Sequence, residues 1–379
     1  MASSSFHASL RWLHRWVGLT VGLIFAVVSV SGSLLLFQPQ FFDWAHGHLM
    51  PASARLQPVG SLDTWVANAK TATPGLVPIA IWPPHADHNV SDVGMIIMAG
   101  RPPGGLGNMG FAGVLLAPAT GEVLGVIDVD RSPAYAPLFL HRDLWTGAVG
   151  RVVSGVMAIG TLFLLVAGLY LWWPPRASLL ARKLSPRPWW TLTQASRLHD
   201  WVGVWSLVVL LVLVGTGLHL VQPHWVEPAI DALPGAPEPD LSASACSGPM
   251  GFDKAVARAR ALAPSSAFVR MNPTGGKPGE WEIGLRPADS SAPQGESHIV
   301  ADMTCGRVFL ETSPDNRRPR EATDLWLSGL HDGTSFGRTG EILVSLAGLM
   351  PLVLAWSGVR MWWRKRRPAR AADRLTRAA

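Results

Sequence analysis

The sequence predicts an α-helical membrane protein with four transmembrane helices from a tandem duplication, in which helix, outer α+β domain and helix occur twice. Three observations predict this class. The 379 residues are 48% hydrophobic, and the mean hydropathy is +0.23, which is high for a soluble protein. Uncharged runs are long enough to cross a bilayer, which takes about 20 helical residues. The phrase Leu-His-x-Trp-Val-Gly occurs at 13–18 and again at 198–203.

Four apolar runs predict the membrane helices. They cover residues 16–42, 152–173, 201–222 and 342–359. The first run has the charge pattern of a signal peptide, but it is long, lacks a small-residue cleavage site and has a twin at 198, so we expect a retained helix. Pro351 removes one helical hydrogen bond from the fourth run and predicts a kink there.

The runs divide the chain into eight predicted segments. These are helix 1 (10–38), periplasmic α+β domain 1 (39–146), helix 2 (147–173), a cytoplasmic loop (174–197), helix 3 (198–222), periplasmic α+β domain 2 (223–337), helix 4 (338–363) and a basic cytoplasmic tail (364–379).

Basic residues predict the orientation. The loop 174–197 carries five Lys and Arg residues and no acidic residue, and Arg and Lys residues also flank the two chain ends. By the positive-inside rule, these segments are cytoplasmic, which predicts a multi-pass membrane protein with both termini inside. The net charge of +6 therefore reports topology and lipid contact. Because the basic residues lie at helix ends instead of forming a separate face, we expect no nucleic-acid partner.

The only two cysteines, Cys246 and Cys305, both lie in the second outer segment. An oxidising compartment would permit a disulfide between them. Two unpaired thiols are the alternative.

The repeat extends over most of the chain. Residues 13–32 align with 198–217, and 140–150 align with 330–340, which places His141 opposite His331. The same register aligns Gly168 with Gly358. Each outer segment begins with a short amphipathic helix (62–70 and 252–260) and continues with four β-type runs. In both segments the last two runs meet at a turn with glycine where positive φ is needed.

These motifs resemble the PepSY-associated transmembrane-helix family over nearly the whole chain. The resemblance is carried by LHRWVG, LHDWVG, LHRDL, GLYLWWPP (168–175) and the turn LAPATGEVLG (116–125). It implies that the outer domains are PepSY-like. Four-helix members with two large outer loops resemble inner-membrane ferric-siderophore reductases of the ferrioxamine-reductase (FoxB) type, which implies haem and iron uptake.

Four histidines belong to the repeat and are the predicted haem-iron ligands: His14, His199, His141 and His331. If the halves pack about an axis along the membrane normal, equivalent histidines face each other, one pair near each membrane surface. Two facing imidazoles suit six-coordinate haem iron. Gly18 and Gly203 each follow a histidine by four residues and would leave room for the porphyrin.

No C-x-x-C-H motif is present, so the expected cofactor is haem b, in two copies. Anchoring of His and Trp at headgroup level is the alternative role, and zinc binding lacks Cys or carboxylate partners at ligand spacing. His219, inside the third apolar run and without a counterpart in the first, is the leading substitute for His141 or His331.

Two functions follow from these expectations. The first is a transmembrane electron carrier that reduces a ferric siderophore, of hydroxamate type, in the periplasm and releases its iron. The donor would be a quinol or a separate cytoplasmic protein, because no flavin or nicotinamide domain is recognisable. The second is a non-redox permease or sensor whose outer domains bind a siderophore or peptide. The membrane runs carry few polar residues besides histidine, which favours the first.

Overall fold

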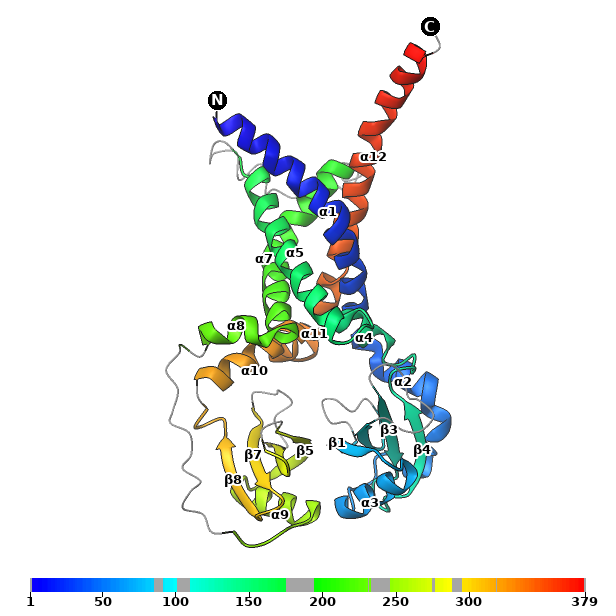
Figure 1. Ribbon diagram of the computed structural model, residues 1–379, viewed down its shortest axis with the longest axis vertical. Coiled ribbons are helices and arrows are strands. Elements are labelled where there is room, and N and C mark those ends of the chain that lie inside the picture. Colours follow the sequence, from blue (N-terminus) through cyan, green and yellow to red (C-terminus); the bar gives the residue numbers. More distant parts are fainter. Residues whose placement is uncertain are drawn as a thin grey trace.

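The structure, a computed structural model, describes residues 2–84, 91–100, 110–174, 194–230, 232, 246–274, 277–287, 295–317 and 319–377. Long helices form a bundle at one end of the molecule, and a β-sheet with short helices lies at the other (Figure 1). The start of α1 and the end of α12 both lie at the end of the bundle away from the sheet. The predicted loop 174–197 falls almost wholly outside the described residues.

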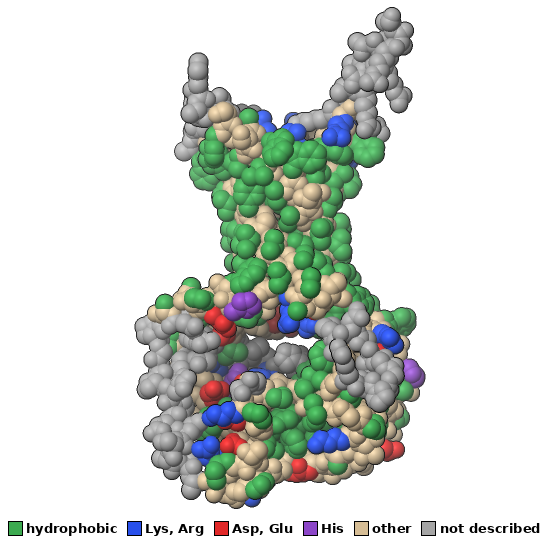
Figure 2. Space-filling model, viewed as in Figure 1, with side chains coloured by type: hydrophobic (Ala, Val, Ile, Leu, Met, Phe, Trp, Pro, Cys, Tyr) green, Lys and Arg blue, Asp and Glu red, His purple; other side chains and the backbone are tan. Residues whose placement is uncertain are grey.

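Four segments are long and apolar enough to cross a membrane: Ser5–Leu49, Ala148–Trp172, Ala195–Val221 and Thr334–Arg364. Their main helices are α1 (Ala2–Leu34), α5 (Ala148–Trp172), α7 (Ala195–Val221) and α12 (Met350–Arg377). Helices α1 and α7 each pack against both α5 and α12. Large apolar side chains such as Val156, Val166 and Val208 are exposed on the bundle surface (Figure 2). Such a surface suits lipid, so the chain is a multi-pass membrane protein, as predicted.

The fourth span is interrupted near its middle. Helix α11 (Gly337–Ala347) ends just before Gly348, and α12 begins with Pro351 in its first turn, where a missing N–H is tolerated. The break leaves carbonyl groups without helical partners. Ser29 Oγ donates to the Gly348 carbonyl at 2.7 Å, and Ser33 Oγ donates to a carbonyl of the preceding turn at 2.7 Å. These bonds from α1 satisfy backbone groups that lipid cannot solvate.

Two similar α+β units follow the first and third spans. The first contains α3 (Leu62–Ala72), β1 (Val77–Trp82), β2 (Gly94–Ala99), β3 (Phe111–Leu116) and β4 (Val123–Asp128). The second contains α9 (Phe252–Leu262), β5 (Ser266–Pro273), β6 (Glu280–Pro287), β7 (Ser297–Asp302) and β8 (Arg307–Thr312). The predicted helices and strands are therefore present. Gly121 and Gly306 have positive φ at the last turn of each unit, as predicted.

The two units share one sheet. Its strand order is β4-β3-β2-β1-β5-β6-β7-β8, and β1 pairs with β5 antiparallel through Ile81 and Met271. These two residues lie at equivalent positions of the sequence repeat. The sequence suggested two separate domains, but the structure joins them edge to edge.

Shorter helices connect the sheet to the bundle. They are η1 (Leu35–Phe37), α2 (Gln38–His46), η2 (Gly47–Leu49), η3 (Ala52–Ala54), α4 (Ala136–Asp143), α8 (Pro223–Ile230), α10 (Pro319–Asp332) and η7 (Thr334–Phe336). Helices α4 and α10 pack against α1 and α7, respectively, near the sheet. They carry His141 and His331.

The two halves of the sheet differ on one face. An apolar cluster that includes Trp65 of α3 and residues of α9 fills the face common to both halves. On the opposite face of the first half, a second apolar cluster includes Phe42 of α2 and Phe139 of α4. The second half instead carries a group of paired charges, including Arg270 and Glu282.

This charged group is closely connected. Arg270 binds Glu282 at 2.7 Å and Glu296 at 2.8 Å, and Arg286 binds Glu296 at 3.0 Å. Burial alone would raise the pKa of Glu282. The hydrogen bond from His298 and the positive charge of Arg270 outweigh burial and lower that pKa to about 2. Glu282 is therefore ionised in the folded protein at neutral pH.

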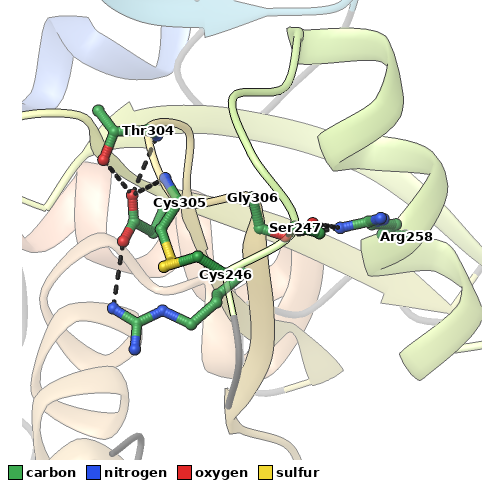
Figure 3. Close-up of a disulfide and its surroundings, with 8 residues drawn as sticks. Cys246, Ser247, Arg258, Thr304, Cys305 and Gly306 are labelled. Carbon is green, nitrogen blue, oxygen red and sulfur yellow. Dashed lines mark hydrogen bonds and ion pairs between the residues drawn. A yellow bond between two sulfur atoms is a disulfide. The ribbon is translucent and has the colours of Figure 1, made fainter.

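Cys246 and Cys305 are joined by a disulfide, with their Cα atoms 4.8 Å apart (Figure 3). The bond ties the segment before α9 to the turn between β7 and β8. Beside it, Ser247 Oγ donates to the Gly306 carbonyl at 3.0 Å, and Arg258 donates to the same carbonyl. The disulfide predicted from the sequence is present in the structure.

Candidate functional site

His14 and His199 meet inside the bundle, near its end away from the sheet. Their rings come from α1 and α7, and the ring centroids lie 6.5 Å apart, with the ring planes at 86°. We call these two residues the terminal pair. Helices α1 and α7 pack mainly against α5 and α12 and not against each other. The two histidine side chains therefore meet across the centre of the bundle.

His141 and His331 form a second pair at the sheet end of the bundle, which we call the sheet-side pair. Their ring centroids are 5.9 Å apart, with the planes at 43°. His141 lies level with Val28 of α1, because its Nδ1 is 2.8 Å from the Val28 carbonyl oxygen. Val28 follows His14 by 14 residues, which is about 21 Å along a helix axis at about 1.5 Å per residue. The two pairs therefore lie at different depths.

Both separations match two imidazoles that share one metal ion. A metal–imidazole bond is about 2.0–2.1 Å and the nitrogen lies about 1 Å from the ring centre, so ligands on opposite sides have centres about 6 Å apart. Among the described residues, no group of three or more His, Cys, Asp or Glu side chains is arranged to hold a metal ion. Each pair thus places two imidazole rings at this separation.

Hydrogen bonds to the neighbouring helix set the tautomer of three of the four rings. His141 Nδ1 donates to the Val28 carbonyl at 2.8 Å, and His331 Nδ1 donates to the Leu213 carbonyl at 3.0 Å. His199 Nδ1 donates to the Leu354 carbonyl at 3.1 Å. A proton held on Nδ1 leaves Nε2 with a free lone pair. Metal-binding histidines commonly have this arrangement.

The terminal pair is not symmetric in this respect. His199 Nδ1 also lies 3.0 Å from the hydroxyl of Ser357, which is fully buried. The equivalent residue in the first half is Ala167, and His14 Nδ1 is buried without a hydrogen-bond partner. The tautomer of His14 is therefore less constrained than that of His199.

Burial keeps the sheet-side pair neutral. These two histidines precede the second and fourth spans. Burial, together with repulsion from His141, lowers the pKa of His331 to about 4. Burial also lowers the pKa of His141. Neutral imidazole is the form that binds a metal.

Each ring lies against a glycine of the neighbouring helix. A Cβ at Gly32 would lie 2.6 Å from the His141 ring, and a Cβ at Gly217 would lie 2.8 Å from the His331 ring. At the terminal pair, the corresponding distances are 3.2 Å from Gly168 to His14 and 3.9 Å from Gly358 to His199. The sequence reasoning did not assign these four roles, although the repeat aligns both glycine pairs.

A cavity of about 460 Å³ contains the terminal pair. This volume is within the range of small-molecule and cofactor sites. The cavity extends along α1 from Arg11 to Phe25 and reaches α5, α7 and α12. Gly18 and Gly203 line it, and a Cβ at either would meet only a leucine methyl at 3.9 or 3.7 Å. Both glycines therefore border open space beside the histidines, and whether a porphyrin fills it stays a prediction.

His219 lies apart from these contacts. It is 6% exposed, and its Nε2 lies 3.0 Å from Asp324 Oδ1 of α10, while its Nδ1 is buried without a partner. Coordination of a metal through Nε2 would require His219 to leave Asp324. The structure brings His141 and His331 together instead, and a role for His219 as a substitute ligand stays a prediction.

These features define a class of protein: a four-span membrane protein with two stacked histidine pairs and an attached α+β sheet. The family model for the PepSY-associated TM region matches residues 11–365, so the chain belongs to that family. The match covers all four spans, both histidine pairs and the sheet. No curated protein matches the chain significantly.

Proposed function

We propose that the protein is a b-type di-haem reductase that passes electrons across the bacterial inner membrane to a ferric siderophore in the periplasm. The observation that carries the proposal is the stacking of two histidine pairs at different depths, each with ring centres about as far apart as two ligands of one metal ion require. Family membership adds support, because the match includes both pairs.

The residues present fit haem b. The four histidines would supply the axial ligands, Gly18 and Gly203 open the space beside the terminal pair, and the 460 Å³ cavity is lined mainly by apolar side chains. When bound, each haem would accept and donate one electron. The protein's own part is to orient the rings. Nδ1 hydrogen bonds hold three of them, and glycines on the neighbouring helices set how closely all four can approach.

The bundle interior between the pairs is apolar. Ala158, Leu165, Leu210 and Val214 are buried there, with Phe25 packed against them. A bilayer core is about 30 Å thick, so two sites about 21 Å apart along the helix axis would divide the distance that an electron must cross. An apolar interior would let electrons pass without opening a path for ions.

Orientation is part of the proposal. The terminal pair would lie at the cytoplasmic side, where Arg and Lys flank the helix ends, and would receive electrons from a quinol or a separate donor protein. The sheet-side pair would face the periplasm. The disulfide between Cys246 and Cys305 lies on that side and suits an oxidising compartment.

We also propose that the chain arose by tandem duplication. Residues at equivalent positions of the repeat make equivalent contacts. The carbonyls of Val28 and Leu213 accept hydrogen bonds from the sheet-side histidines, and Gly32 and Gly217 pack on the rings of those histidines. Ile81 and Met271 pair with each other at the centre of the sheet. Correspondence of this kind in both the membrane and outer parts is expected of two fused copies.

Absorbance of the purified protein tests the cofactor. We expect a Soret band that shifts on reduction with dithionite, and two haems per chain. His14→Ala or His199→Ala should remove one haem and leave the other. A colourless, folded preparation would contradict the proposal and favour a permease or sensor.

Reduction of the chelate is tested separately in proteoliposomes with reductant inside and ferric hydroxamate plus a ferrous trap outside. In a His141→Ala, His331→Ala double variant, the terminal haem should still become reduced, while release of ferrous iron should stop. Unchanged release would remove the sheet-side pair from the electron path. His219→Ala would then be the next variant to measure.

A further inference from the structure

The wall of the terminal cavity is charged differently on its two sides. Arg11 and Arg15 line the cavity on α1, one helical turn apart and on the same face as Gly18. Within the described part of the chain, neither arginine makes a hydrogen bond or an ion pair. Both are exposed. Two guanidinium groups thus border the cavity beside His14, and no described residue accepts a hydrogen bond from them.

The second half of the repeat lacks these charges. The residues equivalent to Arg11 and Arg15 are Ser196 and Asp200 on α7, and Asp200 also lines the cavity. The opening motifs LHRW and LHDW differ at this position. An anionic ligand in the cavity would therefore be attracted to the α1 side, which carries the two guanidinium groups.

We propose that Arg11 and Arg15 bind the two carboxylate side chains of the porphyrin held by the terminal pair. This inference rests on the proposed function and adds the residues that orient the cofactor. A planar guanidinium binds a carboxylate through two parallel hydrogen bonds, which fixes direction as well as charge. Bound in this way, the porphyrin would lie in one orientation, with its acidic edge on α1 and near the end of the bundle where that helix begins.

A general interface role is the competing explanation, because basic residues at helix ends also contact lipid phosphates. Arg364 serves as the matched control. It ends the fourth span at the same end of the bundle, and it is not among the residues that line the cavity. A lipid role predicts similar effects for all three arginines, whereas the proposal predicts effects for Arg11 and Arg15 alone.

The experiment measures loss of haem from the full-length protein to an excess of a soluble apoglobin. Arg11→Gln, Arg15→Gln, the double variant and Arg364→Gln are compared with the wild type. Because a hydrogen bond between oppositely charged groups is stronger than a neutral one, we expect loss of one haem to be roughly tenfold faster in each single variant of the pair and faster still in the double. Arg364→Gln should match the wild type, and Arg11→Lys should partly restore retention.

Reconstitution with the dimethyl ester of the same porphyrin provides a second test, since its carboxylates are masked. The ester should be lost at the same rate from the wild type and from the double variant. Its loss is followed by the absorbance of the ester itself. Equal retention of the free-acid haem by wild type and double variant would overturn this inference alone. The inference would also be overturned if Arg364→Gln sped haem loss as much as Arg11→Gln and Arg15→Gln do. It would likewise fail if the double variant still lost the ester faster than the wild type. If the wild type binds neither porphyrin, the proposed function fails with it.

Discussion

Gly217 gives the most direct test of how the sheet-side pair is held. Alanine at this position would place its Cβ 2.8 Å from Cε1 of His331, so the ring must retreat by about 0.6 Å to reach the 3.4 Å of an ordinary contact. The ring is tied to α7 by Nδ1 bonds of 3.0 Å to the Leu213 carbonyl and to Thr216 Oγ1. A retreat of that size would stretch both beyond hydrogen-bond length.

The expected cost is about 1–3 kcal/mol of unfolding free energy, typical of an overpacked contact. Alanine in place of glycine also favours the helix by up to about 1 kcal/mol, which would mask part of the loss. Gly215→Ala controls for this gain. It lies two residues earlier on α7, and its Cβ would meet nothing within 4 Å. The difference between the two variants therefore isolates contact with the ring.

Thermal unfolding of the detergent-solubilised protein is the assay, with absorbance of the purified protein as a second readout. Gly217→Ala should unfold at a lower temperature than Gly215→Ala and should perturb only one of the proposed haems. Equal stability of the two variants would refute the argument that the His331 ring packs too closely on α7 to admit a Cβ at position 217.

Three further predictions concern the disulfide, the charged group and the break in the fourth span. Cys246 and Cys305 should be recovered as one linked peptide by mass spectrometry without reductant, and reduction should cost about 2–4 kcal/mol of stability; two alkylatable thiols would contradict this. Since the pKa of Glu282 is lowered to about 2 in the folded protein, its contribution should be fully present above about pH 4.5 and disappear as pH falls toward 2. At about 1.4 kcal/mol per pKa unit this is at most about 3 kcal/mol, and an unchanged acid unfolding curve in Glu282→Gln would exclude it. Ser29→Ala should destabilise the bundle by about 1 kcal/mol, because a carbonyl at the break loses its donor. Thr20→Ala, whose hydroxyl bonds only its own helix, should have a smaller effect, and equal effects would argue against the interhelical bond.

Much of the membrane part could be predicted from sequence. Apolar runs reveal the spans because lipid requires about 20 apolar residues in each. The repeat indicated which histidines correspond, and the structure places those residues in facing pairs. Whether they bind haem stays a prediction.

Contacts between segments could not be predicted in the same way. The bond between His219 and Asp324 depends on how α10 lies on α7, and no local pattern encodes that. The hydroxyl of Ser357 beside His199 likewise comes from another helix. Pro351 suggested a disturbed helix, but the serines of α1 that satisfy the break lie far away in sequence. Joining of the two outer units depends on the pairing of β1 with β5, on the shared apolar cluster and on bonds between the starts of α3 and α9, where Asp253 Oδ1 accepts from the Leu62 N–H.

The pairing of β1 with β5 also affects how the chain can fold during synthesis. Ile81 and its partner Met271 are 190 positions apart, so β1 remains an open strand edge until two further spans have been inserted and the second outer unit has formed. Open edges invite pairing with other chains, and contacts so distant in sequence form late. Pro78 near the start of β1 offers one hydrogen-bond donor fewer to a stray strand. Assembly of the sheet therefore waits for the second outer unit, and a chain truncated after its second span would carry an exposed β1 edge.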